Sequence, residues 1–309
     1  MAITLIESAK LSQNKLKKGV IQEVVKASPI LKMLPFETIV GNSLAYNRED
    51  PDNPATVQFR PVDGVWTEST AKYTQVTASL KILGGDADVD NFIQQTRSNI
   101  NNQMANAVKL KSKAMSHTFE NECVYGDADV ENGFDGLHNL VSTSQSLTMA
   151  EDATGAPLSI AKLDELIDLM VNGCDALIMN KNIRRRLTQY LRPLGSYTTK
   201  RDDYGNFWMT WGDDIPIIVS DFITQTELCD ANGMFSAKTG GQTSSIFAVK
   251  FGEGDGLVGI QNGGIETEVF EKLETKDASR TRLKWYCGIA LYSTLSLARL
   301  GNITDAAIS

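Results

Sequence analysis

The chain has 309 residues, of which 42% are hydrophobic and 22% are charged, with 24 Gly and 8 Pro. This composition is typical of a globular protein with one large core or two domains, and it excludes disordered and fibrous classes. The formal net charge of -8 disfavours a protein that reads nucleic acid, because such binding depends on Lys and Arg neutralising phosphates.

The four cysteines, Cys123, Cys174, Cys229 and Cys287, are spread widely along the chain. Their spacing matches neither a disulfide framework nor a zinc site, so we expect reduced thiols. No secretion signal opens the sequence, and no apolar run is long enough to cross a membrane. The expectation is a cytoplasmic protein without a membrane partner.

The first predicted element is a basic amphipathic helix from Ile6 to Ala27, with apolar residues at helical spacing and lysines between them. It ends at Ser28-Pro29, because a residue before proline avoids the helical region. Two interpretations stay open: a helix packed on its own domain, or an arm packed on a neighbouring subunit.

The next part of the sequence predicts a long two-stranded hairpin. Its flanks, Leu44 to Asn47 and Tyr73 to Leu83, alternate apolar and polar residues as strands do. The tract between them carries three prolines and few large apolar residues, so it cannot form a core. Asp63-Gly64 is a hairpin-turn signal that Val65 and Trp66 follow. We interpret this tip as an intermolecular contact, and the alternative is a simple flap.

Residues Asp88 to Phe119 are predicted to form one long helix, with Asp88 or Asp90 capping its start. Its apolar stripe comprises Val89, Ile93, Ile100, Met104, Ala107 or Val108, Lys111, Met115 and Phe119. Neutral amides on the other faces suit contact with a sheet or with neighbouring subunits better than they suit a coiled coil.

A compact α/β unit follows. Ser159 is expected to cap a helix over Ile160 to Asn172, and the other elements are a strand at Ala176 to Met179, a helix at Lys181 to Leu191, and strands at Ile215 to Ser220 and Ile246 to Phe251. Ile265 to Leu273 and Arg282 to Leu297 then return to strand periodicity. These last strands need a partner surface, for which the long helix is the candidate, and the overall class is α+β.

No catalytic, cofactor-binding or metal-binding constellation is predicted. His117 and His138 have no nucleophile or ligand partner at a suitable spacing, so structural roles are expected. Gly254, Gly256 and Gly259 match the dinucleotide-binding pattern, but strand-like residues follow them where a helix must receive the pyrophosphate.

Two charged clusters have more than one interpretation. Asp86, Asp88 and Asp90 resemble the start of a calcium loop, yet the glycine and the later glutamate are missing, and helix capping explains them better. Arg184, Arg185 and Arg186 form a basic cluster that is either a solvated helix face or a charged subunit contact.

Four stretches are similar to members of one family: SPILKMLPFETIVGNSLAYNRE, DNFIQQTRSNINNQMANAVKLKSKAMSHTFENECVYGD, FDGL and ALIMNKNIRRRL. Together with the order of the elements, they make nearly the whole chain resemble the major capsid proteins of tailed double-stranded DNA bacteriophages. That family shares the Hong Kong 97 fold with encapsulin shells.

The resemblance implies an N-terminal arm at 1–42, an extended loop called the E-loop at 43–83, a peripheral domain with a long spine helix at 84–140 and 262–309, and an axial domain at 141–261. It implies a structural, non-catalytic protein that self-assembles into pentamers and hexamers of an icosahedral head. The subunit-interface candidates are Asp63, Val65, Trp66, Arg184, Arg185 and Arg186.

The resemblance also implies partners: other copies of the chain, portal and scaffolding proteins, and a decoration protein. Double-stranded DNA is expected to be enclosed without sequence-specific binding, because a mildly acidic wall repels it. The expected location is the virion capsid, assembled in the host cytoplasm.

Two other functions compete. An encapsulin-type nanocompartment has the same fold and encloses an enzyme cargo in place of a genome. An α/β enzyme built on residues 141–261 is the second alternative, and it is weakened by the missing catalytic constellation.

Overall fold

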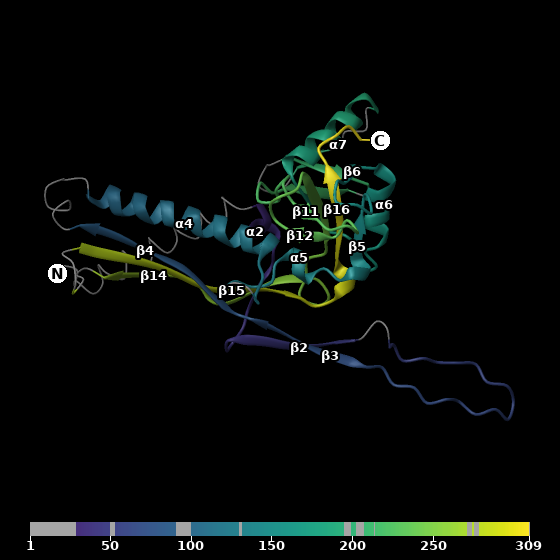
Figure 1. The fold of residues 1–309 in the computed structure, drawn as a ribbon. Coiled ribbons are helices and arrows are strands. Elements are labelled where there is room, and N and C mark those ends of the chain that lie inside the picture. The colour runs from purple at the N-terminus through teal and green to yellow at the C-terminus, as the bar shows by residue number, and fades with distance from the viewer. Residues whose placement is uncertain are drawn as a thin grey trace.

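The computed structural model describes residues 29–49, 53–90, 100–129, 132–194, 199–201, 207–212, 214–270, 274 and 278–308. The predicted helix at Ile6 to Ala27 lies outside the described residues. Three regions are visible: an elongated layer of sheet and helix, a compact α/β body, and a hairpin that projects away from both (Figure 1).

The elongated region is built on a four-stranded sheet of order β1-β14-β15-β4. Its strands are β1 (Phe36–Thr38), β14 (Leu257–Phe270), β15 (Ala278–Leu291) and β4 (Lys81–Asp90). β14 and β15 pair in antiparallel register from Leu257↔Leu291 to Phe270↔Arg280, with an irregularity between Asn262 and Glu266. Gly263 and Gly264 lie in that irregularity with φ of 70° and 74°, a conformation that residues with a Cβ rarely adopt.

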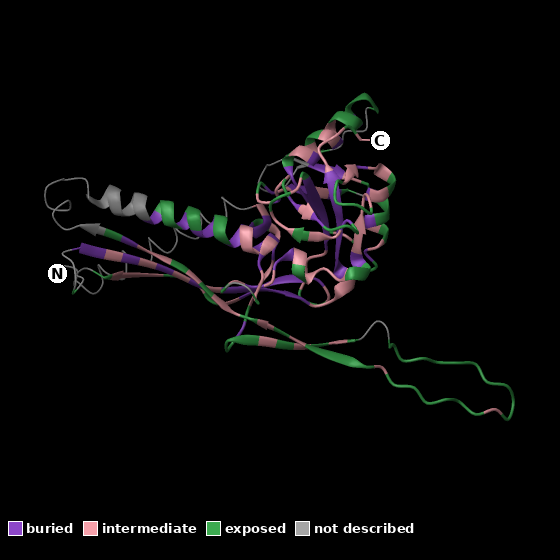
Figure 2. Cartoon of the chain, viewed as in Figure 1, coloured by how far each residue is buried: buried purple, intermediate pink, exposed green. Residues whose placement is uncertain are grey.

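Helix α4 (Ile100–Tyr125) covers one face of this sheet (Figure 1). Phe119 packs its ring 5.0 Å from that of Trp285 on β15 and 6.1 Å from that of Phe36 on β1. Val108, Met115 and Phe119 are buried as predicted, but Lys111 is exposed. The side of α4 that faces away from the sheet lies in solvent, where Leu110 is 70% exposed (Figure 2). The sheet therefore has the long helix as its partner surface, as expected.

The predicted start of the long helix is wrong. Asp88 and Asp90 belong to strand β4, which pairs antiparallel with β15, so neither residue caps a helix. The carboxylates of Asp86 and Asp88 accept hydrogen bonds from Nε of Arg282 (2.8 Å) and Arg280 (2.6 Å). Cross-strand ion pairs thus satisfy the alternating acidic residues. The hydrogen bond from Arg282 holds the pKa of Asp86 below its ordinary value.

The compact body contains an eight-stranded sheet with the path β5-β16-β13-β7-β10-β9-β8, and β6 pairs with β16. The strands are β5 (Ser146–Thr148), β6 (Ala156–Pro157), β7 (Ala176–Met179), β8 (Thr199–Arg201), β9 (Phe207–Trp211), β10 (Ile215–Val219), β13 (Thr243–Val249) and β16 (Leu297–Thr304). The helices and short elements around it are α2 (Pro29–Met33), α5 (Leu137–Leu140), α6 (Ile160–Asp168), α7 (Lys181–Leu194), η1 (Thr143–Gln145), η2 (Thr294–Ser296) and the pair β11 (Leu228–Cys229) and β12 (Phe235–Ala237).

Strand β7 shows how the body is held together. Its four residues are buried, and they alternate between two cores on opposite faces of the sheet. Ala176 and Ile178 join the core that includes Phe119 and Trp285, whereas Leu177 and Met179 join the core under α6 and α7. A short apolar run without polar residues is what a strand covered on both faces requires. The strand predicted at these residues is confirmed.

Strand β16 lies in the compact body. The range 262–309 was expected to lie together in the peripheral part, but β16 pairs with β13 and β5 inside the eight-stranded sheet. In addition, β14 runs unbroken across the expected boundary at 261. Which strands pair depends on how the folded chain brings them together. The order of the strands along the sequence does not determine the pairing alone.

Smaller differences concern element ends. Helix α6 stops at Asp168, before the predicted Asn172, and the side chain of Ser159 makes no capping hydrogen bond. Helix α7 continues through Pro193 to Leu194, beyond the predicted Leu191. After Gly254 and Gly256 the chain enters strand β14, so the glycine pattern lacks the helix that a dinucleotide site needs, as predicted.

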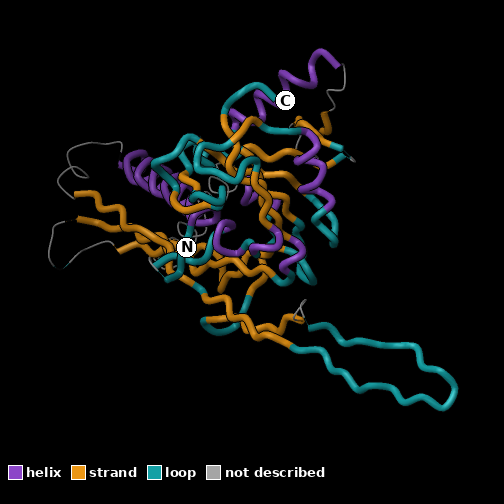
Figure 3. The backbone as a smooth tube through the Cα atoms, turned by 45° about the vertical axis from the view of Figure 1, so that its right-hand side comes forward, coloured by secondary structure: helices purple, strands orange, loops and turns teal. Residues whose placement is uncertain are grey.

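The hairpin consists of β2 (Ser43–Glu49) and β3 (Tyr73–Ser79), paired in antiparallel register from Ser43↔Ser79 to Glu49↔Tyr73. Beyond the paired strands, residues 53–72 form a long loop that points away from the body, which a view turned by 45° shows equally well (Figure 3). The long two-stranded excursion predicted from the sequence is confirmed.

Candidate functional site

The tip of the hairpin is organised by local contacts. Asp63 has a φ of 65°, and the amide of Gly64 donates to the carbonyl of Pro61 at 3.1 Å, so the chain turns at the predicted Asp63-Gly64. Arg60 lies over the ring of Trp66, 4.2 Å from its centroid, and donates to the carbonyl of Gly64 at 2.9 Å. The Trp66 indole donates to the carbonyl of Gln58 at 3.2 Å. The tip therefore has a defined shape without contacting the body.

Apolar side chains at this tip lie in solvent. Val57 is 99% exposed, Phe59 107% and Trp66 62%, and Val62 and Val65 are exposed as well. The structure thus brings the interface candidates Asp63, Val65 and Trp66 together at one exposed end. Sequence reasoning missed Val57 and Phe59, although their alternation along one leg is a signal that could have revealed them. An exposed apolar cluster of this kind is typical of a surface that a partner covers.

The base of the hairpin is attached to the end of strand β15. Arg48 donates from Nε to the carbonyl of Tyr292 (3.1 Å) and from Nη2 to the carbonyl of Leu291 (2.6 Å). The hydroxyl of Tyr46 also donates to the carbonyl of Leu291, at 2.7 Å. Burial raises the pKa of Tyr46, so this hydroxyl stays protonated as a donor. None of these residues was singled out from the sequence.

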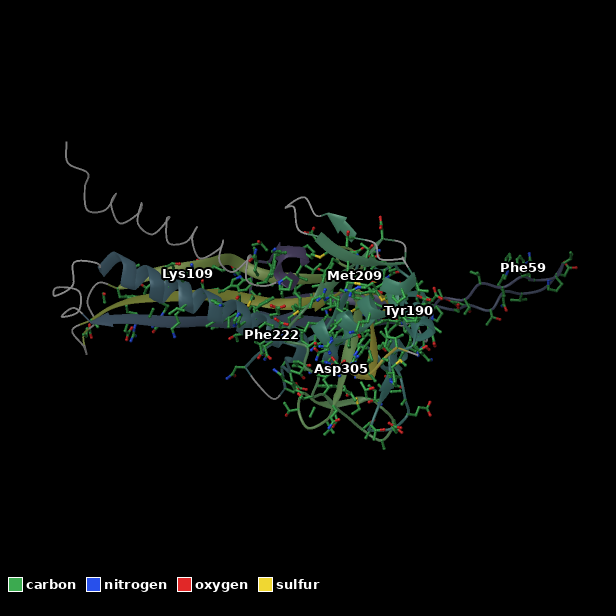
Figure 4. All side chains as sticks on the ribbon, turned by 90° about the horizontal axis from the view of Figure 1, so that it is seen from above. Phe59, Lys109, Tyr190, Met209, Phe222 and Asp305 are labelled. Carbon is green, nitrogen blue, oxygen red and sulfur yellow. The ribbon has the colours of Figure 1, made fainter. Side chains whose placement is uncertain are left out.

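The three arginines lie elsewhere, on helix α7 of the body. Arg186 Nε is 2.6 Å from Asp305 Oδ1, and Arg185 Nη2 is 2.8 Å from Asp305 Oδ2, so both are ion-paired within the subunit. Arg184 is partly buried, and its carbonyl accepts a hydrogen bond from the Thr188 hydroxyl at 2.9 Å. Figure 4 shows Asp305 on the body and Phe59 far out on the hairpin, so the two groups of candidates form separate surfaces.

A buried polar cluster joins the end of α4 to the body. Glu227 Oε1 accepts from the Tyr125 hydroxyl at 2.6 Å and lies 3.3 Å from His138 Nε2, and its Oε2 accepts from the Ser245 hydroxyl at 2.6 Å. Arg299 Nε donates to the same Ser245 hydroxyl at 3.0 Å. The side chains of His138 and Glu227 are almost completely buried. His138 is thus enclosed by the chain and contacts Glu227, and the structural role expected of it stays a prediction.

The cluster also perturbs two pKa values. Burial lowers the pKa of His138 below its ordinary value, and this effect outweighs the opposing one of the neighbouring Glu227 carboxylate. Burial disfavours the charged form of Glu227, but hydrogen bonds from His138, Ser245 and Tyr125 outweigh it and hold the pKa of that carboxyl below its ordinary value. The arrangement is a buried carboxylate stabilised by donors, with the charge of Arg299 nearby.

The described residues hold no group of three or more His, Cys, Asp or Glu that could bind a metal ion. The cysteines Cys123, Cys174, Cys229 and Cys287 form no disulfide. Burial raises the pKa of the Cys174 thiol to about 11 and that of Cys287 to about 12, which makes both poor nucleophiles. Among the helices of the described chain, none combines the length and apolar character needed to cross a bilayer.

Comparison with solved structures finds similar chains in an encapsulin complex, in a GTA capsid and in a phage. The encapsulin of the holo-SrpI complex from Synechococcus elongatus PCC 7942 is similar with a TM-score of 0.69 and 17% identity, over 91% of this chain and 89% of that chain. The capsid of the native GTA particle is similar with a TM-score of 0.60 and 10% identity, over 90% of both chains. A chain of Mycobacterium phage Bobi has a TM-score of 0.58 and 12% identity, over 88% of this chain and 89% of that one.

At these identities the likeness establishes the fold alone, and it confirms the expected α+β, Hong Kong 97-like architecture. No curated protein matches the chain. The family described as SU10 major capsid protein matches residues 8–230, which is more than half of the sequence. The chain therefore belongs to the SU10 major capsid protein family, and it is a structural protein whose copies form the shell of a virion.

Proposed function

We propose that this capsid protein assembles as pentamers and hexamers into the icosahedral head of a tailed bacteriophage and that its hairpin tip is a contact between subunits. One observation supports the proposal above all others: Val57, Phe59, Val62, Val65 and Trp66 are exposed on a hairpin that has no core of its own. Burying each such side chain contributes about 1.5–3 kcal/mol.

Contacts of this kind add up in a closed shell. A stable interface buries about 1,600 Å² in total, and each subunit of a symmetric array makes several such contacts. Asp63 belongs to the same tip and would form part of the polar rim around the apolar contact. Arg185 and Arg186 are weaker candidates than the sequence suggested, because both already form ion pairs with Asp305 within the subunit.

The division of the chain is part of the proposal. We assign 43–83 to the E-loop, and α4 with the four-stranded sheet to a peripheral domain. The eight-stranded sheet, now including Leu297–Thr304, forms the axial domain. The segment 29–42 belongs to an N-terminal arm that supplies strand β1 to the four-stranded sheet.

Partners follow from this role. The head would need portal and scaffolding proteins, could carry a decoration protein, and would assemble in the host cytoplasm. Double-stranded DNA would be enclosed without sequence-specific binding, in keeping with the net charge of -8. A shell needs no catalytic step, and we propose that the chain has none.

The alternative is an encapsulin-type compartment that encloses an enzyme cargo, which the similarity to the Synechococcus elongatus encapsulin favours. Particle contents separate the two functions. A phage head recovered from infected cells contains nuclease-protected DNA of uniform length, whereas a compartment contains a second protein and no such DNA.

The proposal is tested by assembly of the purified full chain, with its scaffolding protein if one is encoded nearby. Closed particles with pentameric and hexameric units in electron micrographs are the expected result. A monomer that persists at every protein concentration and salt condition, with and without the scaffolding protein, would overturn it.

A further inference from the structure

We propose that Arg48 is a positioning residue that fixes the direction in which the hairpin leaves the subunit, and hence which part of a neighbour the tip reaches. The inference rests on the proposed role of the hairpin as a contact between subunits. It concerns the base of the hairpin, whereas the apolar contact concerns its tip.

The side chains that attach the hairpin form one row. Leu44, Tyr46 and Arg48 alternate along β2 and are partly buried, whereas the residues between them are exposed. Leu44 and Tyr46 pack on a small apolar cluster made of Ile39, Ile260 and Ala290. Apolar packing is not directional, so this cluster holds the hairpin close without setting its angle. Arg48 is the outermost member of the row, one residue before the end of the paired part of the hairpin.

Arg48 supplies the directional contact. Its guanidinium donates to two successive carbonyls, those of Leu291 (2.6 Å) and Tyr292 (3.1 Å), at the place where the pairing of β14 with β15 ends. Two donors of one rigid planar group on two neighbouring acceptors fix an orientation as well as a distance. A single ammonium group on a flexible stem fixes only a distance.

Tyr292 connects this contact to a third segment. Its ring meets that of Tyr46 edge to face at 5.0 Å, and its hydroxyl donates to Glu37 Oε2 on β1 at 2.7 Å. The Leu291 carbonyl accepts from both Tyr46 and Arg48. The hairpin, the end of β15 and strand β1 are therefore joined by one set of hydrogen bonds, which we call the Arg48 clamp: Glu37, Tyr46, Arg48, Leu291 and Tyr292.

The length of the hairpin makes the angle at its base important. The turn at Asp63 lies about 15 residues beyond Arg48. An extended chain of that length would reach roughly 50 Å, so a rotation of about 10° at the base would move the tip by roughly 9 Å. A shift of that size would move Trp66 off any surface complementary to it. Loss of the clamp would thus change where the tip lands without unfolding the subunit.

The test measures the hairpin angle in the full-length unassembled chain. Spin labels are placed at Glu68→Cys, on the leg that returns from the tip, and Gln189→Cys on α7, two exposed positions, with the partly buried Cys174 changed to Ser. With Arg48 present we expect one narrow distance distribution. Arg48→Ala should broaden it about twofold or more, and Arg48→Lys, which keeps the charge and the stem, should broaden it to a lesser degree.

Arg60→Ala is the matched control, because it removes the same charge at the tip and leaves the clamp intact; its distribution should equal that of the parent. A parental width in Arg48→Ala, or in Arg48→Lys, would overturn the proposal. If thermal unfolding shows that Arg48→Ala does not fold, the distance distribution of Arg48→Lys alone tests the proposal.

A second experiment, on particle assembly, distinguishes a failure of this inference from a failure of the proposed function on which it rests. Arg48→Ala subunits should give open sheets or particles of mixed diameter where the parent gives uniform ones. If the parent itself never assembles, the proposed contact between subunits is contradicted. The distance measurement still tests whether Arg48 sets the angle of the hairpin.

Discussion

The hairpin and the eight-stranded sheet both contain paired strands, yet apolar side chains are exposed in the hairpin and buried in the sheet. Leu177, Ile246 and Phe247 in the sheet are completely buried, whereas Val57 and Phe59 on the hairpin are almost completely exposed. Strand pairing alone does not explain this difference, because Tyr73 in the paired part of the hairpin is also 70% exposed, and Val57 and Phe59 lie on the loop beyond the paired residues. What differs is a second layer: helices and a second core lie against the sheet, and nothing in the described chain lies against the hairpin tip.

The comparison separates two kinds of stability. Side chains in the body determine the free energy of unfolding of the subunit, whereas side chains on the hairpin would determine the free energy of assembly. Variants of the two regions should therefore affect different measurements.

The largest expected effect on the subunit comes from Phe247→Ala in the body. Removing this completely buried ring should lower the free energy of unfolding by about 3–5 kcal/mol. Phe59→Ala on the hairpin is the matched control and should change it by less than about 0.5 kcal/mol. Guanidinium unfolding of unassembled subunits measures both, and equal losses would contradict the comparison.

Glu227→Gln should come next. It removes a buried charge that accepts hydrogen bonds from Tyr125 and Ser245 and leaves Arg299 without a nearby opposite charge. The expected loss is about 2–3 kcal/mol by chemical unfolding, since hydrogen bonds to charged groups are the stronger ones. Glu165→Gln at the exposed pair with Lys162 is the control and should be nearly neutral.

The same cluster predicts a pH dependence. Because the pKa of His138 is lowered in the folded state, the unfolded chain binds the proton first, and stability should fall as the pH drops below the ordinary value of 6.5. The lowered pKa of Glu227 adds a further loss as the pH falls below its ordinary 4.5. Unfolding midpoints from pH 8 to pH 4 measure both, and His138→Gln should remove the upper part of the dependence. A flat profile in the parent would contradict this account.

A smaller effect is expected at the rim of the body. Asp305→Asn weakens the pairs with Arg185 and Arg186, which are partly exposed, so the unfolding free energy should fall by less than about 1 kcal/mol. Assembly should continue. If this variant instead blocks assembly while the subunit stays stable, the arginine cluster is a subunit contact after all.

The smallest effect on the subunit is expected from Trp66→Ala. The ring contacts Arg60 and the hairpin itself but not the body, so the unfolding free energy should change by less than about 0.5 kcal/mol. Particle formation should nevertheless be reduced strongly, as measured by light scattering and electron microscopy. Normal assembly of this variant would contradict a role for Trp66 in the contact and would assign the contact to other residues of the tip.

Much of the hairpin could be predicted from the sequence. The alternation after Tyr73, the prolines and Asp63-Gly64 are local signals, and local signals specify strands and turns. The clamp at Arg48 could not be predicted, because its acceptors are backbone carbonyls 243 and 244 residues away. Backbone groups carry no sequence signature.

At strand β4 the local sequence signals led to a wrong prediction. Asp86, Asp88 and Asp90 alternate with Ala87 and Val89, which is a strand pattern, but acidic residues before a helix also predict capping. The choice depended on Arg280 and Arg282, which lie 192 and 196 residues further along the chain. The same limit applies to β16, whose sequence is typical of a strand but does not say which sheet it enters.

The sequence by itself determined which segments bury apolar side chains and which cannot, because that depends on composition and periodicity within each segment. Only the tertiary structure decided how the segments meet: which strands pair, that Glu227 is held by Tyr125 and Ser245, and at what angle the hairpin leaves the body. Those outcomes depend on hydrogen bonds and packing between residues far apart in sequence, and many alternative pairings satisfy the same local pattern.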